Sequence, residues 1–233
     1  MLIGCSVFAA IGVAVASPVR AQAAWSATPA SDYRYRGRSF SENRPTATLN
    51  LSYDHKSGAY AGAALIGVDT AGHGLQLMGF ADYVGMAGRT RRGLGWDAGL
   101  SDTRFTYYKG GERTYRYREA YVGALTDHFA ARIYYSPNYL GLGQKTLYVD
   151  FGAAYRPAPD WRVFGHFGAL TPVGGRSAFG NPRERYDASI GASAKLRNLE
   201  IKLSASKVLP EPANPTFRKV QGEAVTLAAS YFF

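Results

Sequence analysis

Few side chains in this sequence could serve as general bases, nucleophiles or metal ligands, and they are far apart. Histidine occurs at His55, His73, His128 and His166, and the first three fall in or beside predicted turns. His166 is predicted in the middle of a strand, but the sequence places no acidic residue or nucleophile beside it. The chain has no Gly-x-Ser-x-Gly motif and no histidine spacing typical of zinc sites. We therefore expect no enzymatic activity, no metal centre and no cofactor.

Charged side chains supply another kind of chemistry, ion selectivity, if they line a water-filled interior. The polar faces of the alternating segments described below carry Asp97, Glu119, Arg132, Asp150, Arg162, His166, Asp187, Lys195, Glu200 and Lys202. An excess of positive charge inside a channel favours anions, and the basic candidates are Arg132, Arg162, Lys195 and Lys202. Alternatively, each cation pairs with an acidic neighbour, because buried charges are usually paired. The sequence leaves both interpretations open.

Strands must position these residues, because period-2 alternation recurs after residue 24 and no long stretch has the 3.6-residue period of a helix. In Leu199–Ala205, for example, apolar residues alternate with Glu200, Lys202 and Ser204. The mean hydropathy of −0.19 is too low for a helical membrane protein. Twelve strands are predicted, near 25–35, 45–54, 58–67, 74–83, 95–107, 116–125, 128–136, 145–155, 160–169, 186–196, 199–208 and 222–233. The sequence thus predicts an all-β fold, a 12-stranded antiparallel transmembrane β-barrel.

Connection lengths support a barrel of the outer-membrane type. If the first strand starts on the periplasmic side, the connections returning there are His55–Gly58, 84–94, Thr126–Asp127, Arg156–Pro159 and Arg197–Asn198. All but 84–94 are tight turns, whereas the opposite set is longer, at Gly37–Arg44, Ser136–Gln144, Leu170–Arg185 and Leu209–Gln221. Short turns on one side and long loops on the other are typical of outer-membrane barrels. A two-residue turn at Arg197–Asn198 would also pair Leu196 with Leu199 and Lys195 with Glu200, on opposite faces.

The first 23 residues differ from the rest of the chain. The apolar stretch Leu2–Ala16 and the following Ala21-Gln22-Ala23 predict a cleaved secretory signal peptide in 1–23, with the barrel in 24–233. No Lys or Arg precedes the apolar stretch, so we expect the true start codon to lie upstream. Removing the signal also removes Cys5, the single cysteine, which excludes disulfides and cysteine-based metal sites in the mature chain.

The net charge of +10 fits anions in a pore, an acidic membrane surface or nucleic acid. Lys and Arg are scattered singly or lie in predicted loops such as Arg89–Arg92, and they form no basic stripe. Nucleic acid is therefore not an expected partner.

The C-terminal strand alternates apolar residues and ends in an aromatic residue. Val225, Leu227, Ala229, Tyr231 and Phe233 share one face. This pattern resembles the signal recognised by the outer-membrane assembly machinery, with Tyr231 and Phe233 at its end. We therefore expect the bacterial outer membrane as the location, and its lipid and assembly machinery as partners, besides small solutes or ions. An interfacial aromatic girdle is predicted from Trp96, Trp161, Tyr53, Tyr155 and Tyr231.

A motif near the start carries a narrower resemblance. Ser31-Asp32-Tyr33-Arg34-Tyr35-Arg36-Gly37-Arg38-Ser39, followed by Ser57-Gly58-Ala59-Tyr60-Ala61-Gly62, resembles the TorF-type porin family, long catalogued as a bacterial domain of unknown function. The motif residues carried over are Ser31, Asp32, Tyr33, Arg36 and Gly37. Arg38 departs from the pattern, since the family usually has an apolar residue there. The resemblance is looser beyond residue 69 and implies a porin-like outer-membrane barrel without an established substrate.

Together these features predict a porin-like channel for the passive diffusion of small hydrophilic solutes, which prefers anions if the lumen cations are not paired with acidic neighbours. The alternative is a non-conducting outer-membrane barrel that acts as a structural anchor or adhesin through its long loops. A lipid-modifying barrel enzyme is the interpretation that the residues favour least.

Overall fold

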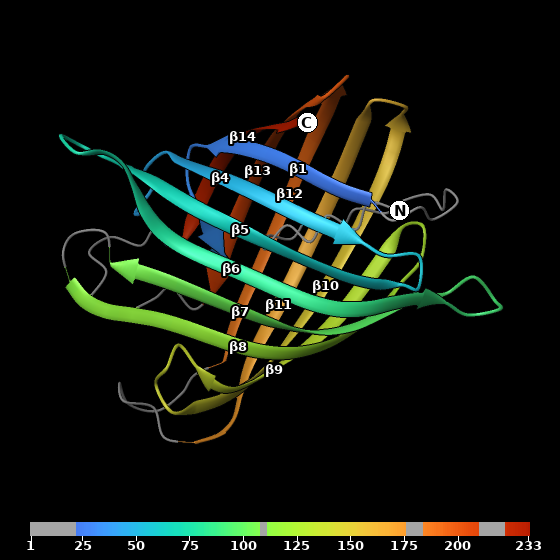
Figure 1. Ribbon diagram of the computed structural model, residues 1–233, viewed down its shortest axis with the longest axis horizontal. Coiled ribbons are helices and arrows are strands. Elements are labelled where there is room, and N and C mark those ends of the chain that lie inside the picture. The colour runs from blue at the N-terminus through green and yellow to red at the C-terminus, as the bar shows by residue number, and fades with distance from the viewer. Residues whose placement is uncertain (1–21, 108–110, 176–183, 210–221) are drawn as a thin grey trace.

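The barrel is built from twelve antiparallel strands that close on themselves (Figure 1). The computed structural model describes residues 22–107, 111–175, 184–209 and 222–233. The barrel strands are β1 (Gln22–Ala30), β4 (Thr46–Asp54), β5 (Ala59–Thr70), β6 (Gly74–Arg89), β7 (Gly95–Tyr107), β8 (Gly111–Leu125), β9 (Phe129–Tyr139), β10 (Gln144–Ala158), β11 (Trp161–Gly175), β12 (Arg185–Leu196), β13 (Leu199–Leu209) and β14 (Glu223–Phe232). The predicted fold is confirmed, because each of the twelve predicted segments overlaps one barrel strand.

Pairing between β1 and β14 closes the sheet and brings both termini of the barrel to one end. Ser26 pairs with Phe232, and the strands run antiparallel. We name this the terminal end, and the opposite end, with the turn at 71–73, the loop end. The predicted signal peptide, 1–23, lies almost wholly outside the described residues, and β1 begins at Gln22.

Alternation sorts the side chains into an apolar outer face and a mixed inner face. Leu49, Leu100 and Ile190 are more than half exposed on the outside, as lipid-facing residues of a barrel must be. The predicted register of the β12–β13 hairpin is also observed, with Leu196 opposite Leu199 and Lys195 opposite Glu200. Within the described ranges no helix is long and apolar enough to cross a membrane.

Exposed aromatic side chains encircle the terminal end of the barrel. They lie at the strand ends nearest the turns of that side and include Trp25, Tyr53, Trp96, Tyr155, Trp161 and Tyr231. Five of these six positions were predicted for an interfacial girdle. Rings in such a girdle lie between hydrocarbon and water.

Three connections are shorter than predicted, because the strands beside them continue. β6 extends to Arg89, so the predicted connection 84–94 is reduced to a turn in which Thr90 N donates to Leu94 O. β9 extends to Tyr139, and the predicted loop Ser136–Gln144 becomes a turn at 140–143. β11 continues to Gly175 and β12 begins at Arg185, so the predicted loop 170–185 is shortened too, and 176–183 lie outside the described residues. Of the loop predicted at 209–221, only Leu209 is described, as the last residue of β13.

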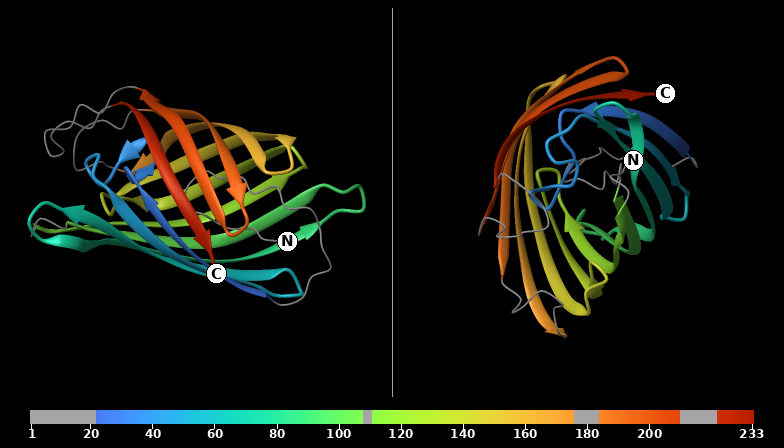
Figure 2. Two further views of the ribbon diagram at one scale, coloured as in Figure 1. Left: turned by 90° about the horizontal axis from the view of Figure 1, so that it is seen from above. Right: turned by 90° about the vertical axis from the view of Figure 1, so that its left-hand side faces the viewer.

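The first strand and the loop after it differ most from the prediction. The segment predicted as a strand over 25–35 leaves the sheet at Ala30, and the chain then forms a small separate hairpin of β2 (Arg34–Tyr35) and β3 (Arg38–Ser39). The prediction of an outer loop at Gly37–Arg44 is therefore wrong, because this segment folds into the barrel. Figure 2 shows the hairpin inside the ring of strands.

Candidate functional site: the lumen and its hairpin

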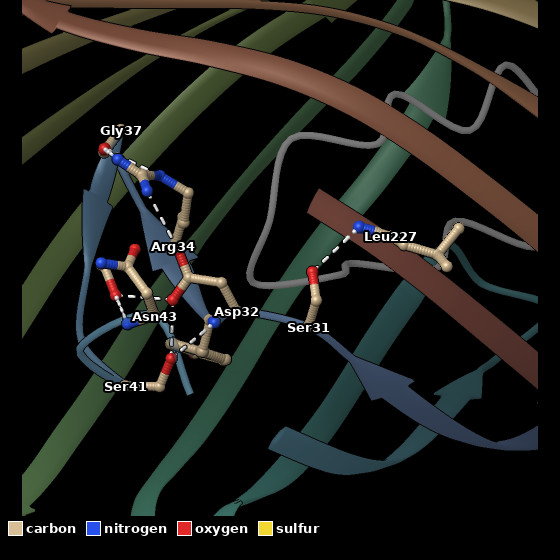
Figure 3. Close-up of polar contacts among 9 residues, drawn as sticks. Ser31, Asp32, Arg34, Gly37, Ser41, Asn43 and Leu227 are labelled. Carbon is tan, nitrogen blue, oxygen red and sulfur yellow. Dashed lines mark hydrogen bonds and ion pairs between the residues drawn. The ribbon is translucent and has the colours of Figure 1, made fainter. Parts of the chain in front are cut away.

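The hairpin leaves the barrel wall at Ser31. Ser31 N donates to Leu227 O at 2.9 Å, and Leu227 N donates to Ser31 Oγ at 3.1 Å (Figure 3). These bonds continue the β1–β14 pairing for one residue beyond the end of the strand. They therefore fix the point at which the chain turns inward.

Asp32 organises the hairpin from within. Its carboxylate accepts hydrogen bonds from Ser39 Oγ at 2.5 Å, Ser41 Oγ at 2.6 Å and Arg34 Nη1 at 3.0 Å (Figure 3). Ser41 Oγ also accepts a bond from Tyr33 N at 2.9 Å. Asp32 and Ser41 are buried, so these bonds compensate the carboxylate for lost water. The hairpin is therefore a specifically folded unit.

Gly37 brings the tip of the hairpin against the far wall. Its φ of +72° lies in the left-handed region, which glycine adopts without steric cost. A Cβ at this position would lie 2.8 Å from Asp187 Cβ and 3.0 Å from Val208 Cβ. Since Ser31 is held at β14 and the tip abuts β12 and β13, a residue larger than glycine would displace the tip.

Arg36 and Glu119 form the central ion pair between the hairpin and β8. Arg36 Nη2 lies 2.7 Å from Glu119 Oε2 and Arg36 Nη1 lies 2.9 Å from Oε1, a bidentate geometry that is stronger than a single contact. Tyr35 OH donates to the same carboxylate at 3.2 Å, and the Arg36 guanidinium lies 3.9 Å from the Tyr148 ring centroid. The two charged side chains are only 7% and 3% exposed. The pair therefore acts as a buried latch.

Ionisation within the hairpin follows from this burial. Burial alone would lower the pKa of Arg36, but the Glu119 carboxylate and the neighbouring phenols of Tyr35, Tyr139 and Tyr148 together raise it well above the ordinary value. Burial raises the pKa of the Tyr33 and Tyr35 phenols well above their usual range. Burial, and then the charge of Arg185, lower the pKa of Arg38. Arg38, the arginine that departs from the family pattern, thus lies near the like charge of Arg185, whereas the charge of Arg36 is balanced by Glu119.

Aromatic side chains pack the hairpin against the inside of β7 and β8. Phe40 stacks on Phe105 with ring centroids 4.3 Å apart, and the Tyr35 and Tyr117 centroids are 5.2 Å apart. Phe105 and Tyr117 are almost completely buried. The hydrophobic core of this protein therefore lies inside the barrel near the loop end, with the hairpin as one of its sides.

A second ion pair lies on the same wall, nearer the terminal end. Arg132 Nη2 on β9 is 2.6 Å from Asp97 Oδ2 on β7, and Asp97 is 1% exposed. Tyr60 OH reaches Asp97 Oδ2 at 3.3 Å and the Tyr121 hydroxyl at 2.7 Å. For Arg132 the structure thus favours the paired alternative over a free cation in the lumen.

His166 has the acidic neighbours that the sequence did not place beside it. Its Nδ1 lies 3.0 Å from Asp150 Oδ1 and its Nε2 lies 2.8 Å from Asp187 Oδ1, and Tyr148 OH donates to Asp187. The expectation of an isolated histidine was wrong, because cross-strand pairing puts positions far apart in sequence side by side: Asp150 pairs with Gly168, and Gly168 with Asp187. In the described part of the chain no group of His, Cys, Asp or Glu is arranged to hold a metal.

The remaining predicted lumen residues form a basic group on β11–β13 toward the terminal end. Ser193 on β12 pairs with Arg162 on one side and Lys202 on the other. Both cations lie against the Phe164 ring, with Lys202 Nζ at 4.8 Å and Arg162 Cζ at 5.6 Å from its centroid. Lys195, opposite Glu200, lies next to the terminal-end turn. We name Arg162, Lys195, Lys202 and Glu200 the basic group, which holds three cations and one carboxylate.

The wall formed by β14, β1 and β4 carries small polar side chains on its inner face. They are Ser26, Thr28, Thr48, Asn50, Ser52, Thr226 and Ser230, and all are partly exposed. Some contact each other, as where Thr28 Oγ1 lies 2.9 Å from Ser230 Oγ. This small polar wall contrasts with the buried aromatic and charged side chains of β7–β10.

The predicted assembly residues lie at the end of β14. Tyr231 and Phe233 are exposed on the outside, with ring centroids 5.0 Å apart. Phe233 N donates to Trp25 O at 3.2 Å. The last residues therefore take part in barrel closure.

The sequence identified the motif residues Ser31, Asp32, Tyr33, Arg36 and Gly37 but gave them no structural role. The sequence did contain a signal for a turn. Ser39 and Ser41 follow Asp32 within ten residues, and a glycine stands between the aspartate and the two serines. The first part of the motif, Ser31–Tyr35, fell within the strand predicted near 25–35. Only the distant partners, Glu119 above all, show that it belongs in the lumen.

Comparison with known proteins agrees with this fold. A family described as a bacterial protein of unknown function (Gcw_chp) matches residues 14–233, whereas no curated protein matches. The solved structure of the KdgM porin is similar with a TM-score of 0.57 and 10% identity, covering 91% of this chain and 99% of that one. The KdgM porin in complex with disordered oligogalacturonate gives 0.56 and 8%, with the same coverage. The outer membrane channel DcaP of Acinetobacter baumannii gives 0.41 and 10%, covering 91% of this chain and 97% of that one.

Proposed function

This chain belongs to the Gcw_chp family of bacterial proteins of unknown function, and we propose that it is an outer-membrane channel for passive diffusion of small hydrophilic solutes. The fold is that of porins, which supports the bacterial outer membrane as its location. The terminal end, with its tight turns, faces the periplasm. The TorF-type porin identity suggested by the motif is part of this proposal.

One observation carries the proposal: the hairpin fills the lumen unevenly. The hairpin packs against β7 and β8, whereas the small polar side chains of β14, β1 and β4 remain partly exposed. A solute path along the small polar wall would be lined by hydroxyl and amide groups. Such groups can replace water around a hydrophilic solute.

We further propose that the channel prefers anions. The ion pairs Arg36–Glu119 and Arg132–Asp97 are balanced, and so contribute little net field. The basic group has three cations for one carboxylate, and it lies on the inner face near the periplasmic mouth. A local excess of positive charge concentrates anions. Small anionic solutes and inorganic anions are therefore the proposed substrates.

The test is reconstitution of the purified, folded barrel in a planar lipid bilayer. We expect discrete conductance steps in KCl, and a reversal potential under a KCl gradient whose sign shows chloride preference. Steps with cation preference would remove the anion proposal and keep the channel. Silence from protein whose folding is verified by heat-modifiable gel mobility would contradict the channel itself.

The buried latch favours a second candidate function, a non-conducting anchor or adhesin. Arg36 and Glu119 are packed as tightly as core residues, as expected for a permanent plug. The bilayer experiment separates the two functions, because an anchor gives no conductance whether or not its loops bind a partner.

A further inference from the structure

Five charged side chains gather on the outer face of the barrel, where β6, β7 and β8 lie side by side (Figure 1). In the sheet, Asp102 stands opposite both Asp82 and Arg118, and Arg104 stands opposite Arg116. We name these five residues the outer arginine cluster. It is separate from the lumen and takes no part in the proposed channel.

The cluster points away from the lumen. Side chains alternate between the two faces along a strand, and the alternating positions Thr103 and Tyr117 are buried inside with the hairpin. Arg104 is 46% and Arg118 66% exposed. These guanidinium groups therefore face whatever surrounds the barrel.

Register places the cluster in the loop-end half of the apolar band. On the outer face of β7, Trp96 and Leu100 precede Arg104. The strand rises about 26 Å from Trp96 to Arg104 at ~3.3 Å per residue, or about 19 Å along the axis for a tilt of ~45°. The lipid-facing band of such barrels is about 25 Å tall. The Cα of Arg104 thus lies in the outer-leaflet half of the band, about 6 Å below its edge, and the long arginine side chain can carry its guanidinium up to the headgroup level. Leu100 stays among acyl chains.

The carboxylates of the cluster do not saturate its arginines. Arg104 Nη2 and Arg116 Nε each donate to Asp102 at 2.9 Å, whereas Arg118 Nε lies 3.9 Å from Asp102 Oδ2. A guanidinium has five N–H donors and a carboxylate about four acceptor sites. Three arginines against Asp82 and Asp102 therefore leave donors directed outward and an excess of positive charge. The Asp102 carboxylate offsets the repulsion between Arg104 and Arg116, which stand opposite each other, and this uses up acceptor sites that Arg118 would otherwise share.

We propose that the outer arginine cluster binds the phosphate groups of a phosphorylated glycolipid of the outer leaflet, which is lipopolysaccharide in a Gram-negative outer membrane. Guanidinium groups match phosphate oxygens in a bidentate geometry. The exposed Leu100 and Val122 lie below the cluster and contact the acyl chains of the same lipid. The inference rests on the proposed membrane location and is independent of conduction.

The far side of the barrel offers a matched control. Lys207 on β13 and Glu223 on β14 stand opposite each other and form an ion pair. Both are exposed. This pair has one charge of each sign and leaves no excess for an anion.

The experiment compares the wild-type barrel with R104Q/R118Q, which keeps the Arg116–Asp102 contact. Binding of lipid A to each purified protein in detergent is measured by native mass spectrometry. We expect lipid A to bind the double variant at least about tenfold more weakly, a difference of about 1.4 kcal/mol. Dephosphorylated lipid A should bind the wild type weakly, and K207Q/E223Q should bind lipid A as the wild type does.

Equal binding of lipid A by the wild type and R104Q/R118Q would overturn the proposal, as would equal binding of dephosphorylated lipid A. Displacement of lipid A by millimolar inorganic phosphate would show a site for free phosphate and would also overturn it. Heat-modifiable gel mobility verifies that each variant is folded. Conductance in bilayers free of lipopolysaccharide should match the wild type for both variants. Silence of all three proteins would therefore count against the channel and not against the lipid site.

Discussion

The two sides of the barrel lumen differ in what they present to a solute. On β7–β10, large and charged residues such as Phe105, Tyr117, Glu119 and Tyr148 are buried against the hairpin. On β14, β1 and β4 the inner residues are small and polar, and they stay partly exposed. Ring contacts with Phe105 and Tyr117 and the ion pair with Glu119 hold the hairpin on the side of β7 and β8. The comparison teaches that the path through this barrel should run off its axis.

The largest effect is expected from breaking the latch on the packed side. Glu119→Gln leaves the Arg36 guanidinium buried without its counter-charge, which should lower the free energy of unfolding by about 3–5 kcal/mol. Glu223→Gln, in an exposed ion pair, should change the free energy of unfolding far less, because solvent screens such a pair. Urea titration of both variants in lipid vesicles measures the difference. Equal midpoints would mean that the latch does not hold the hairpin.

Removing the hairpin should abolish the asymmetry between the two sides. Replacing residues 32–44 by a short Gly-Ser linker takes the rings of Tyr35 and Phe40 out of the lumen. We expect single-channel conductance to rise by about three- to fivefold. The side chains of an eight-stranded barrel fill its interior, whereas a wider barrel has room for an open pore once nothing else fills it. An unchanged conductance would place the hairpin outside the path of the ions.

The positive charges on the inner face of β11–β13, which lie between the packed side and the small polar wall, should set the ion selectivity of the channel. R162Q/K202Q removes two positive charges from the inner face, and we expect the chloride-to-potassium permeability ratio to fall by about two- to threefold. R104Q/R118Q removes the same charge from the outer face and should leave the ratio unchanged. Reversal potentials under a KCl gradient provide the measurement. A similar fall in both variants would show that only net charge matters.

The smallest effect is expected from narrowing the small polar wall. Thr28→Tyr adds a ring on the inner face of β1 and should reduce conductance by about half, because the proposed path runs beside it. Ala27→Tyr adds the same ring to the lipid-facing side and serves as the matched control. If both variants conduct like the wild type, the path lies elsewhere in the lumen.

The barrel could be predicted from the sequence, because the alternation of apolar and polar residues in each strand shows which side chains face lipid and which face the lumen. Leu196, Leu199, Lys195 and Glu200 were paired correctly from a two-residue turn alone. Lipid contact imposes this alternation locally, residue by residue. The strand ends were less certain, as β6 and β9 show, because residues beyond the apolar band no longer need an apolar face.

The candidate site was only partly accessible from sequence. Parity on each strand selected Asp97, Asp150 and Arg132 for the inner face but gave no partner to any of them. Two carboxylates reach His166 across three strands, and that contact depends on register between segments far apart in the chain. The outer arginine cluster was missed for the same reason, since its members come from three strands and alternate with buried residues.

By itself, the sequence determined an antiparallel barrel with twelve strands, its register at one hairpin and its apolar exterior, because these depend on short-range periodicity. Only the tertiary structure decided that Ser31–Ser39 folds inward, that Arg36 meets Glu119, and which side of the lumen stays lined by small polar residues. Those outcomes depend on closure of the sheet, which brings β14 beside β1 and Glu119 beside a hairpin 83 positions away.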